Sequence, residues 1–121
     1  MSERTDSLSA EVLQEFFPDD NLRTLVELFV DGVSRIDGVG RLVAGKFHDG
    51  TIRFYAVWDV NSGDHDKITR LCGESFLSYA RDGKDFLVIH FTQEGFQAEE
   101  NSQHFKSIDS GTIWERLEEA E

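Results

Sequence analysis

Cysteine and proline are almost absent from this sequence, which holds one of each, Cys72 and Pro18. A single thiol cannot form an internal disulfide framework or a multi-thiolate metal site. Cys72 falls among the apolar positions of a predicted helix, so we expect it to pack as a small hydrophobic side chain. Proline removes a helical hydrogen-bond donor, so Pro18 should mark the end of a first short helix.

Basic residues are also scarce, with 12 Lys and Arg against 24 Asp and Glu and a formal net charge of −12. Such a surface repels phosphate backbones and anionic lipids, and no run of basic residues offsets it. We therefore expect neither nucleic acid nor membrane as a partner. Two explanations of the acidity stay open: a solvated surface that keeps the protein soluble, or a salt-adapted host, with which the low lysine content agrees.

Long apolar runs are missing as well. No stretch approaches the roughly 20 apolar residues that cross a bilayer, and the polar, acidic residues 1–11 resemble neither a signal peptide nor a transit peptide. We expect a cytoplasmic protein. Hydrophobic residues make up 39% of the chain, including ten Phe, which suffices for one core. The expectation is a single α+β domain over residues 7–117, between a disordered tail at 1–6 and a frayed acidic tail at 118–121.

Residues 38–60 predict a central β-hairpin closed by a two-residue turn at Asp49-Gly50, since both residue types tolerate positive φ. This turn would pair His48 with Thr51 and set the register of the whole hairpin. One face would then form the core and carry apolar side chains at alternate positions: Val39, Val43, Phe47, Ile52, Phe54, Ala56 and Val60. The near-continuous apolar run at 54–58 predicts an interior strand that is buried on both faces.

Helical spacing and capping residues predict covering helices before and after the hairpin. The predicted elements are a short helix capped by Ser7 or Ser9, a second helix from Asp19 to near Asp37, and a third from Asp64 or Asp66 to Asp82. A strand at 86–92 would then run parallel to 51–60 through a right-handed crossover, which gives a mixed sheet. We interpret 92–103 as a surface loop, and prefer strand to helix for the ambiguous segment 110–117.

Candidate ligand residues surround Gly63, where oxygen-bearing side chains alternate along the chain at Asp59, Asn61, Asp64 and Asp66. The pattern resembles part of an EF-hand or dockerin calcium loop. The glycine lies one position early, however, and Arg70 stands where a closing glutamate is needed. We therefore expect metal binding to be absent or millimolar and no cofactor to be present; the other interpretation is a strand-to-helix loop with capping acids.

Catalytic motifs are not found: the sequence has no nucleophile elbow, zinc-spaced pair or glycine-rich phosphate loop. We interpret His90 as a hydrogen-bonded histidine of a strand, and the acids are scattered through caps and loops instead of converging on a pocket. No catalytic residue is assigned, and a non-enzymatic role is favoured.

The order helix, hairpin, helix, strand over residues 22–116 resembles the minimal nucleotidyltransferase domain. In that family a Gly-Ser after the first strand holds phosphates, and paired aspartates on the second strand bind metal ions. Here Gly45 falls at the turn glycine, Lys46 replaces the serine, and Ile52 and Phe54 occupy the carboxylate positions. The resemblance implies a non-catalytic relative, since two divalent cations need carboxylates. The Roadblock family of dimerising scaffolds shows a similar order of elements.

The function we expect is that of a protein-interaction or regulatory module without catalysis. The alternative is a degenerate nucleotidyltransferase-like domain that binds a nucleotide or metal through Asp59, Asp64 and Asp66. We also expect a homodimer, because one chain would have difficulty burying all its large aromatic groups and aromatic residues are enriched at interfaces. The candidate interface residues are Tyr55, Trp58, Phe96 and Trp114.

Overall fold

The computed structural model describes residues 6–36, 38–47, 51–59, 65–78 and 86–116. In chain order the elements are β1 (Asp6–Leu8), α1 (Ala10–Phe16), α2 (Asp20–Ser34), β2 (Val39–Lys46), β3 (Ile52–Trp58), α3 (His65–Ser75), β4 (Phe86–Thr92), α5 (Gln93–Glu100), α6 (Gln103–Lys106) and β5 (Asp109–Arg116). Among the described residues the strands form a five-stranded mixed sheet in the order β1-β5-β2-β3-β4, in which only β3 and β4 are parallel. The fold is therefore α+β, as predicted.

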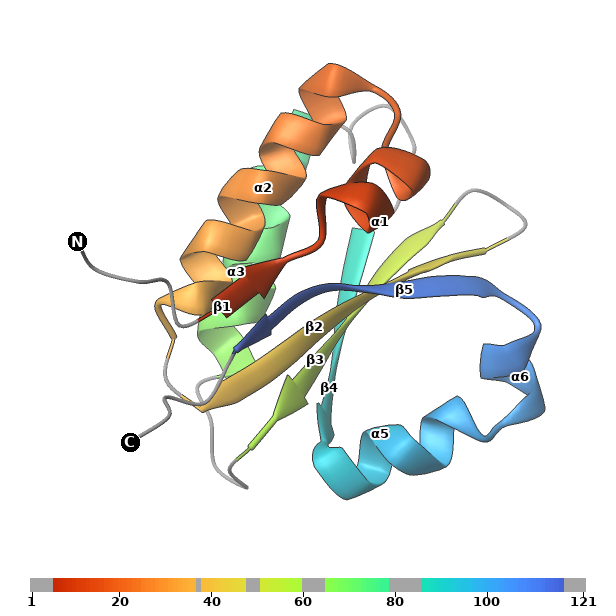
Figure 1. Cartoon of the computed structure of the whole chain (residues 1–121). Helices are drawn as coiled ribbons and strands as arrows, with labels where there is room; N and C mark the ends of the chain where they lie inside the picture. Colours follow the sequence, from red (N-terminus) through yellow and green to blue (C-terminus); the bar gives the residue numbers. More distant parts are fainter. Residues whose placement is uncertain (1–5, 37, 48–50, 60–64, 79–85, 117–121) are drawn as a thin grey trace.

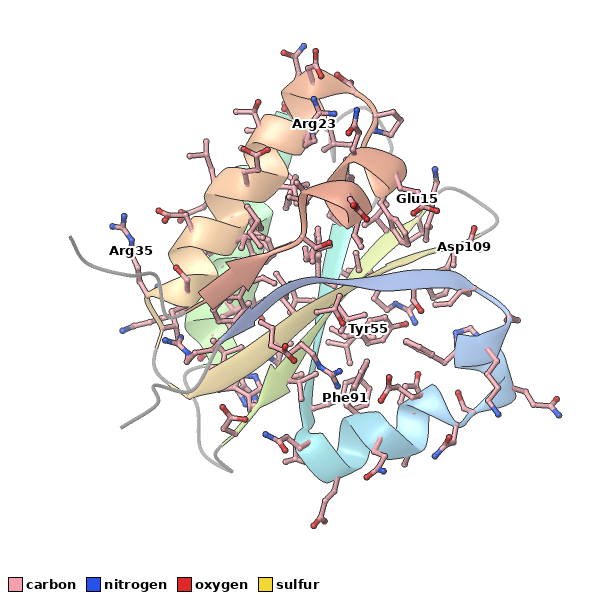
Figure 2. The ribbon with its side chains drawn as sticks, viewed as in Figure 1. Glu15, Arg23, Arg35, Tyr55, Phe91 and Asp109 are labelled. Carbon is pink, nitrogen blue, oxygen red and sulfur yellow. The ribbon has the colours of Figure 1, made fainter. Side chains whose placement is uncertain are left out.

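Helices cover both faces of the sheet (Figure 1): α1, α2 and α3 lie on one face, and α5 and α6 on the other. The first face is an apolar core in which the Phe54 ring packs among Phe17, Phe29 and Phe76. The second face is a smaller aromatic core in which Tyr55 lies 5.9 Å from Phe91, ring centre to ring centre (Figure 2). Alternation of side chains along β3 explains how one strand supplies both cores.

Helix starts follow the capping chemistry of the sequence. The Ser9 hydroxyl accepts a hydrogen bond from the Val12 amide, and the Asp19 carboxylate accepts one from the Asn21 amide at 3.0 Å. These confirm the predicted caps of the first two helices. α2 ends at Ser34, slightly before the predicted stop near Asp37.

The interior position of β3 and the parallel crossover to β4 are confirmed. β3 lies between β2 and β4 and is buried along nearly its whole length. Its parallel register with β4 runs without a shift from Ile52 opposite Phe86 to Trp58 opposite Thr92. The preference for strand near the C-terminus is also confirmed, by β5.

The predicted hairpin register is wrong by one residue. Lys46 lies opposite Ile52, and the Phe47 amide donates to the Thr51 carbonyl at 3.0 Å, so three residues instead of two separate the closing pair. A shift of one residue moves side chains to the opposite face. Val43 therefore packs with the α5 and α6 core, while Leu42 and Ala44 join the other core. Asp49-Gly50 lies outside the described residues.

The predicted surface loop at 92–103 is also wrong, because most of it is the helix α5. The Thr92 hydroxyl caps this helix by accepting from the Gly95 amide at 3.1 Å. Phe96 is fully buried against Tyr55, Phe91 and Phe105, which gives the helix its packing energy. At the N-terminus, Asp6 belongs to β1 and not to the predicted tail; the rest of that tail and residues 118–121 lie outside the described residues.

Within the described ranges, the helices include none with both the length and the apolar character needed to cross a membrane.

Candidate functional site

The carboxyl ends of the parallel strands β3 and β4 lie at the same edge of the sheet. Asp59 directly follows β3, Gln93 directly follows β4, and α3 begins nearby at His65. Ligand sites of open α/β sheets form at such strand ends. Two groups of polar side chains gather there, one on each face of the sheet.

Asp59 is held on the α5 face by a β-bulge. The register between β2 and β3 shifts between Val39 and Arg41, which makes Gly40 the extra residue. A Cβ added to Gly40 would lie only 2.5 and 2.6 Å from the two carboxylate oxygens of Asp59. The Asp59 amide donates to the Gly38 carbonyl at 2.7 Å, and Gly38 has a φ of 95° that favours glycine. The bulge therefore places the Asp59 carboxylate against the backbone of Gly40, where a side chain would leave no room.

Gln93 orients the side chain of Asp59, because its side-chain amide Nε2 donates a hydrogen bond to Asp59 Oδ1. The first residue of α5 thus orients a carboxylate at the end of β3. Bulges often re-aim a side chain near functional sites.

A cleft of about 450 Å³ opens beside Asp59, between α5 and the ends of β2, β3 and β5. The charged residues among its described lining are two arginines and four acids: Arg41, Arg116, Asp59, Glu94, Glu100 and Glu115. The lining therefore carries two more negative than positive charges. Val57 contributes an apolar part of the wall.

The two arginines of the cleft differ in their bonding. Arg116 donates from Nε to the Val39 carbonyl at 3.0 Å, and from Nη2 to the carbonyls of Ser34 and Ile36. It therefore closes the C-terminal end of α2 and joins it to the sheet. The Arg41 guanidinium lies 5.0 Å from the centre of the Phe96 ring and 3.9 Å from Glu100, too far for a hydrogen bond.

A histidine pair lies on the other face of the sheet, the face that α3 covers. The rings of His65 and His90 are stacked, with centres 4.3 Å apart and planes 4° apart. The Trp58 indole N–H donates to His90 Nδ1 at 3.0 Å, and His90 Nε2 lies 3.1 Å from the Thr69 hydroxyl. An indole nitrogen only donates, so His90 Nδ1 carries no proton and Nε2 donates to Thr69.

The environment of His90 favours its neutral form. The pKa of His90 is lowered to about 4, mainly by burial and to a lesser extent by the neighbouring His65, and Asp66 partly opposes this shift. On the same face, burial raises the pKa of the Cys72 thiol to about 12. The thiol is thus neutral and packed in the core, as predicted, and does not form the nucleophilic thiolate.

The predicted ligand residues are only partly described. Asp59 lines the cleft on the α5 face, whereas Asp66 is exposed in the first turn of α3, which covers the other face. Asn61 and Asp64 lie outside the described residues. In the part of the chain that the structure describes, no group of three His, Cys, Asp or Glu side chains could hold a metal ion.

The predicted interface residues are all buried within one chain. Trp58 and Trp114 belong to the core under α1, α2 and α3, and Tyr55 and Phe96 to the core under α5 and α6. None is more than 1% exposed. The premise that one chain could not bury them is therefore wrong, because helices cover both faces of the sheet, and these four side chains offer no surface to a second chain.

Several residues of the cleft were missed by the sequence reasoning. Gly40 carried a usable signal, since a glycine inside a strand pattern often marks a bulge. Glu94 carried another, since an acid in the first turn after a threonine cap is typical of a helix start. Arg41 and Arg116 carried none, because only the sheet pairing brings β2 and β5 to the cleft.

Comparisons with protein-family models, curated proteins and solved structures find no match to this chain.

Proposed function

We propose that this protein is a non-catalytic interaction module that associates with a second copy of itself through the edge of β4. The observation that carries the proposal is the composition of this strand. β4 stands at the end of the strand order, so among the described strands it pairs only with β3.

Three common protections against strand pairing, namely charged residues, proline and a bulge, are absent from β4 itself. Its sequence, FLVIHFT, contains no Asp, Glu, Lys, Arg or Pro, although 30% of the chain is charged. Its register with β3 shows no bulge. Natural edge strands are commonly blocked by charges, proline or bulges, so a strand without them is suited to pair with another chain.

A second copy is the partner that fits this strand. An antiparallel pair with its twofold axis near Ile89 would place Leu87 opposite Phe91 of the second copy. Leu87 is 48% exposed, one of the large apolar side chains most open to solvent. Apolar cross-strand pairs stabilise sheets, and the absence of acids from β4 lets two acidic chains approach at this point.

The absence of catalysis is supported by the groups that could otherwise react. The Cys72 thiol is buried with a raised pKa, and both ring nitrogens of His90 have hydrogen-bond partners in Trp58 and Thr69. At the positions that would hold the nucleotidyltransferase carboxylates, Ile52 and Phe54 are core side chains. These contacts favour the interaction module over a catalytic domain.

The test measures mass by sedimentation or light scattering at tens of micromolar and moderate salt. Wild type should approach twice 13.8 kDa. Leu87→Lys should give a monomer, because a lysine on an edge strand opposes pairing. The matched control is Leu28→Lys on α2, where the leucine is 61% exposed; this variant should remain a dimer. A wild-type mass near 13.8 kDa, or equal dissociation in both variants, would contradict the proposal.

A further inference from the structure

We infer that the cleft beside Asp59 binds a small zwitterion with an additional cation, the chemical class of the basic amino acids. Arg41 would hold the carboxylate of this ligand, and Asp59 with the neighbouring acids would hold its ammonium groups. This binding goes beyond the interaction module and does not depend on the dimer.

Arg41 is the recognition group for a carboxylate. Its side chain is 31% exposed, and its nearest described acid, Glu100, lies 3.9 Å away, outside hydrogen-bond distance. The guanidinium lies over the Phe96 ring at cation–π distance, a contact that helps to hold it in position. A positioned guanidinium that makes no hydrogen bond to another described residue suits bidentate binding of a carboxylate. Arg116 cannot take this role equally well, because backbone carbonyls already occupy its Nε and Nη2.

The acids of the cleft are the recognition groups for amines. Asp59 is held by Gln93 and by the bulge at Gly40, so its carboxylate is already in place before a ligand arrives. Glu94 and Glu115 line the same cleft. The acids would repel a ligand that carries only negative charge. A ligand that carries only positive charge would leave Arg41 without a counter-ion. A zwitterion with a surplus positive charge matches both features of the lining.

The size of the cleft agrees with a small ligand. Its volume of about 450 Å³ falls within the range of about 300 to 1,000 Å³ typical of small-molecule sites. Much of it is already formed, since a bulge, a helix start and an arginine bonded to three carbonyls define its walls. A preformed site loses little free energy to ordering on binding.

The experiment compares L-lysine with cadaverine, which has the same two amines and no carboxylate. Amide chemical shifts of ¹⁵N-labelled protein are followed at fixed pH and ionic strength. L-lysine should cause saturable shifts at Gly40 and Gln93 but not at Leu28. Cadaverine should bind about tenfold more weakly, since the charge-assisted bonds of one carboxylate are lost.

Variants assign the two roles. Arg41→Gln should remove the preference for lysine over cadaverine, and Asp59→Asn should weaken the binding of both. The matched controls are Arg35→Gln and Asp31→Asn, which change the same charges in an exposed ion pair at the C-terminal end of α2 and should bind like wild type. Arg41→Lys keeps the positive charge without the planar guanidinium and should retain part of the preference for lysine over cadaverine. This variant replaces Arg41→Gln if the latter fails to fold.

Equal binding of lysine and cadaverine by wild type would overturn the inference, because it would indicate a cation-attracting acidic surface only. Absence of saturable shifts at Gly40 and Gln93 would also overturn it, as would an unchanged preference in Arg41→Gln. The Leu87→Lys variant should bind lysine as wild type does, so failure of the dimer and failure of this site are measured separately.

Discussion

Among single residues, His90 links protonation to folding. The unfolded chain should titrate near the ordinary histidine pKa of about 6.5, whereas burial lowers the folded pKa to about 4. Between these values the unfolded state binds more protons than the folded state, so stability rises with pH there. The contribution of His90 is therefore fully present above about pH 6.5 and is lost as the pH falls towards 4.

We predict that denaturant melts will show lower stability at pH 5 than at pH 7, and that this loss will shrink in His90→Gln. The exposed His104 supplies the matched control, and His104→Gln should keep the wild-type pH dependence. Ring NMR signals give a direct reading, with His90 titrating near pH 4. A folded-state pKa near the ordinary value would mean that burial does not hold His90 neutral.

Among the elements, β3 is the strand on which both cores depend. Phe54 has no exposed surface, and its ring lies 5.0 Å from Phe29 and 5.6 Å from Phe76, centre to centre. Phe54→Ala should lower the free energy of unfolding by about 3 to 5 kcal/mol, through lost burial and the cavity that remains. Lys46→Ala at the exposed end of β2 should change it little. Denaturant melts of the two variants test this prediction. Equal, small losses in the free energy of unfolding would show that Phe54 is not a core residue.

The elements also show how far sequence reasoning reaches. The apolar run at 54–58 and the β-formers of 86–92 sufficed to predict a buried strand with a parallel neighbour, because burial on both faces leaves a nearly continuous apolar pattern. The hairpin register depends instead on the length of one loop. Asp-Gly favours a loop one residue shorter than the loop between the paired residues Phe47 and Thr51. α5 was missed because Phe96 is its only buried side chain, so no helical period is visible.

The candidate site was predictable only in part for a related reason. Asp59 stands out in the sequence because other oxygen-bearing residues follow it closely. Its actual neighbours, Gly40 and Gln93, are remote in sequence, and a bulge and a helix start bring them together. Long-range pairing of this kind leaves no local pattern from which a cleft could be read.

On the scale of the whole molecule, net charge sets the conditions under which two copies can pair. Each chain carries a formal charge of −12, so two copies repel at low ionic strength. Salt shortens the Debye length to about 8 Å at physiological ionic strength, while the apolar contacts proposed for β4 are not screened. We predict that the dimer fraction rises between low and moderate salt at tens of micromolar protein.

Leu87→Lys should remain monomeric in both conditions, although it also removes one unit of net negative charge. If charge alone controlled association, this variant would dimerise better than wild type, so its mass by sedimentation separates pairing through β4 from a general effect of screening. A wild-type mass near 13.8 kDa at both salt concentrations would exclude the dimer in this concentration range.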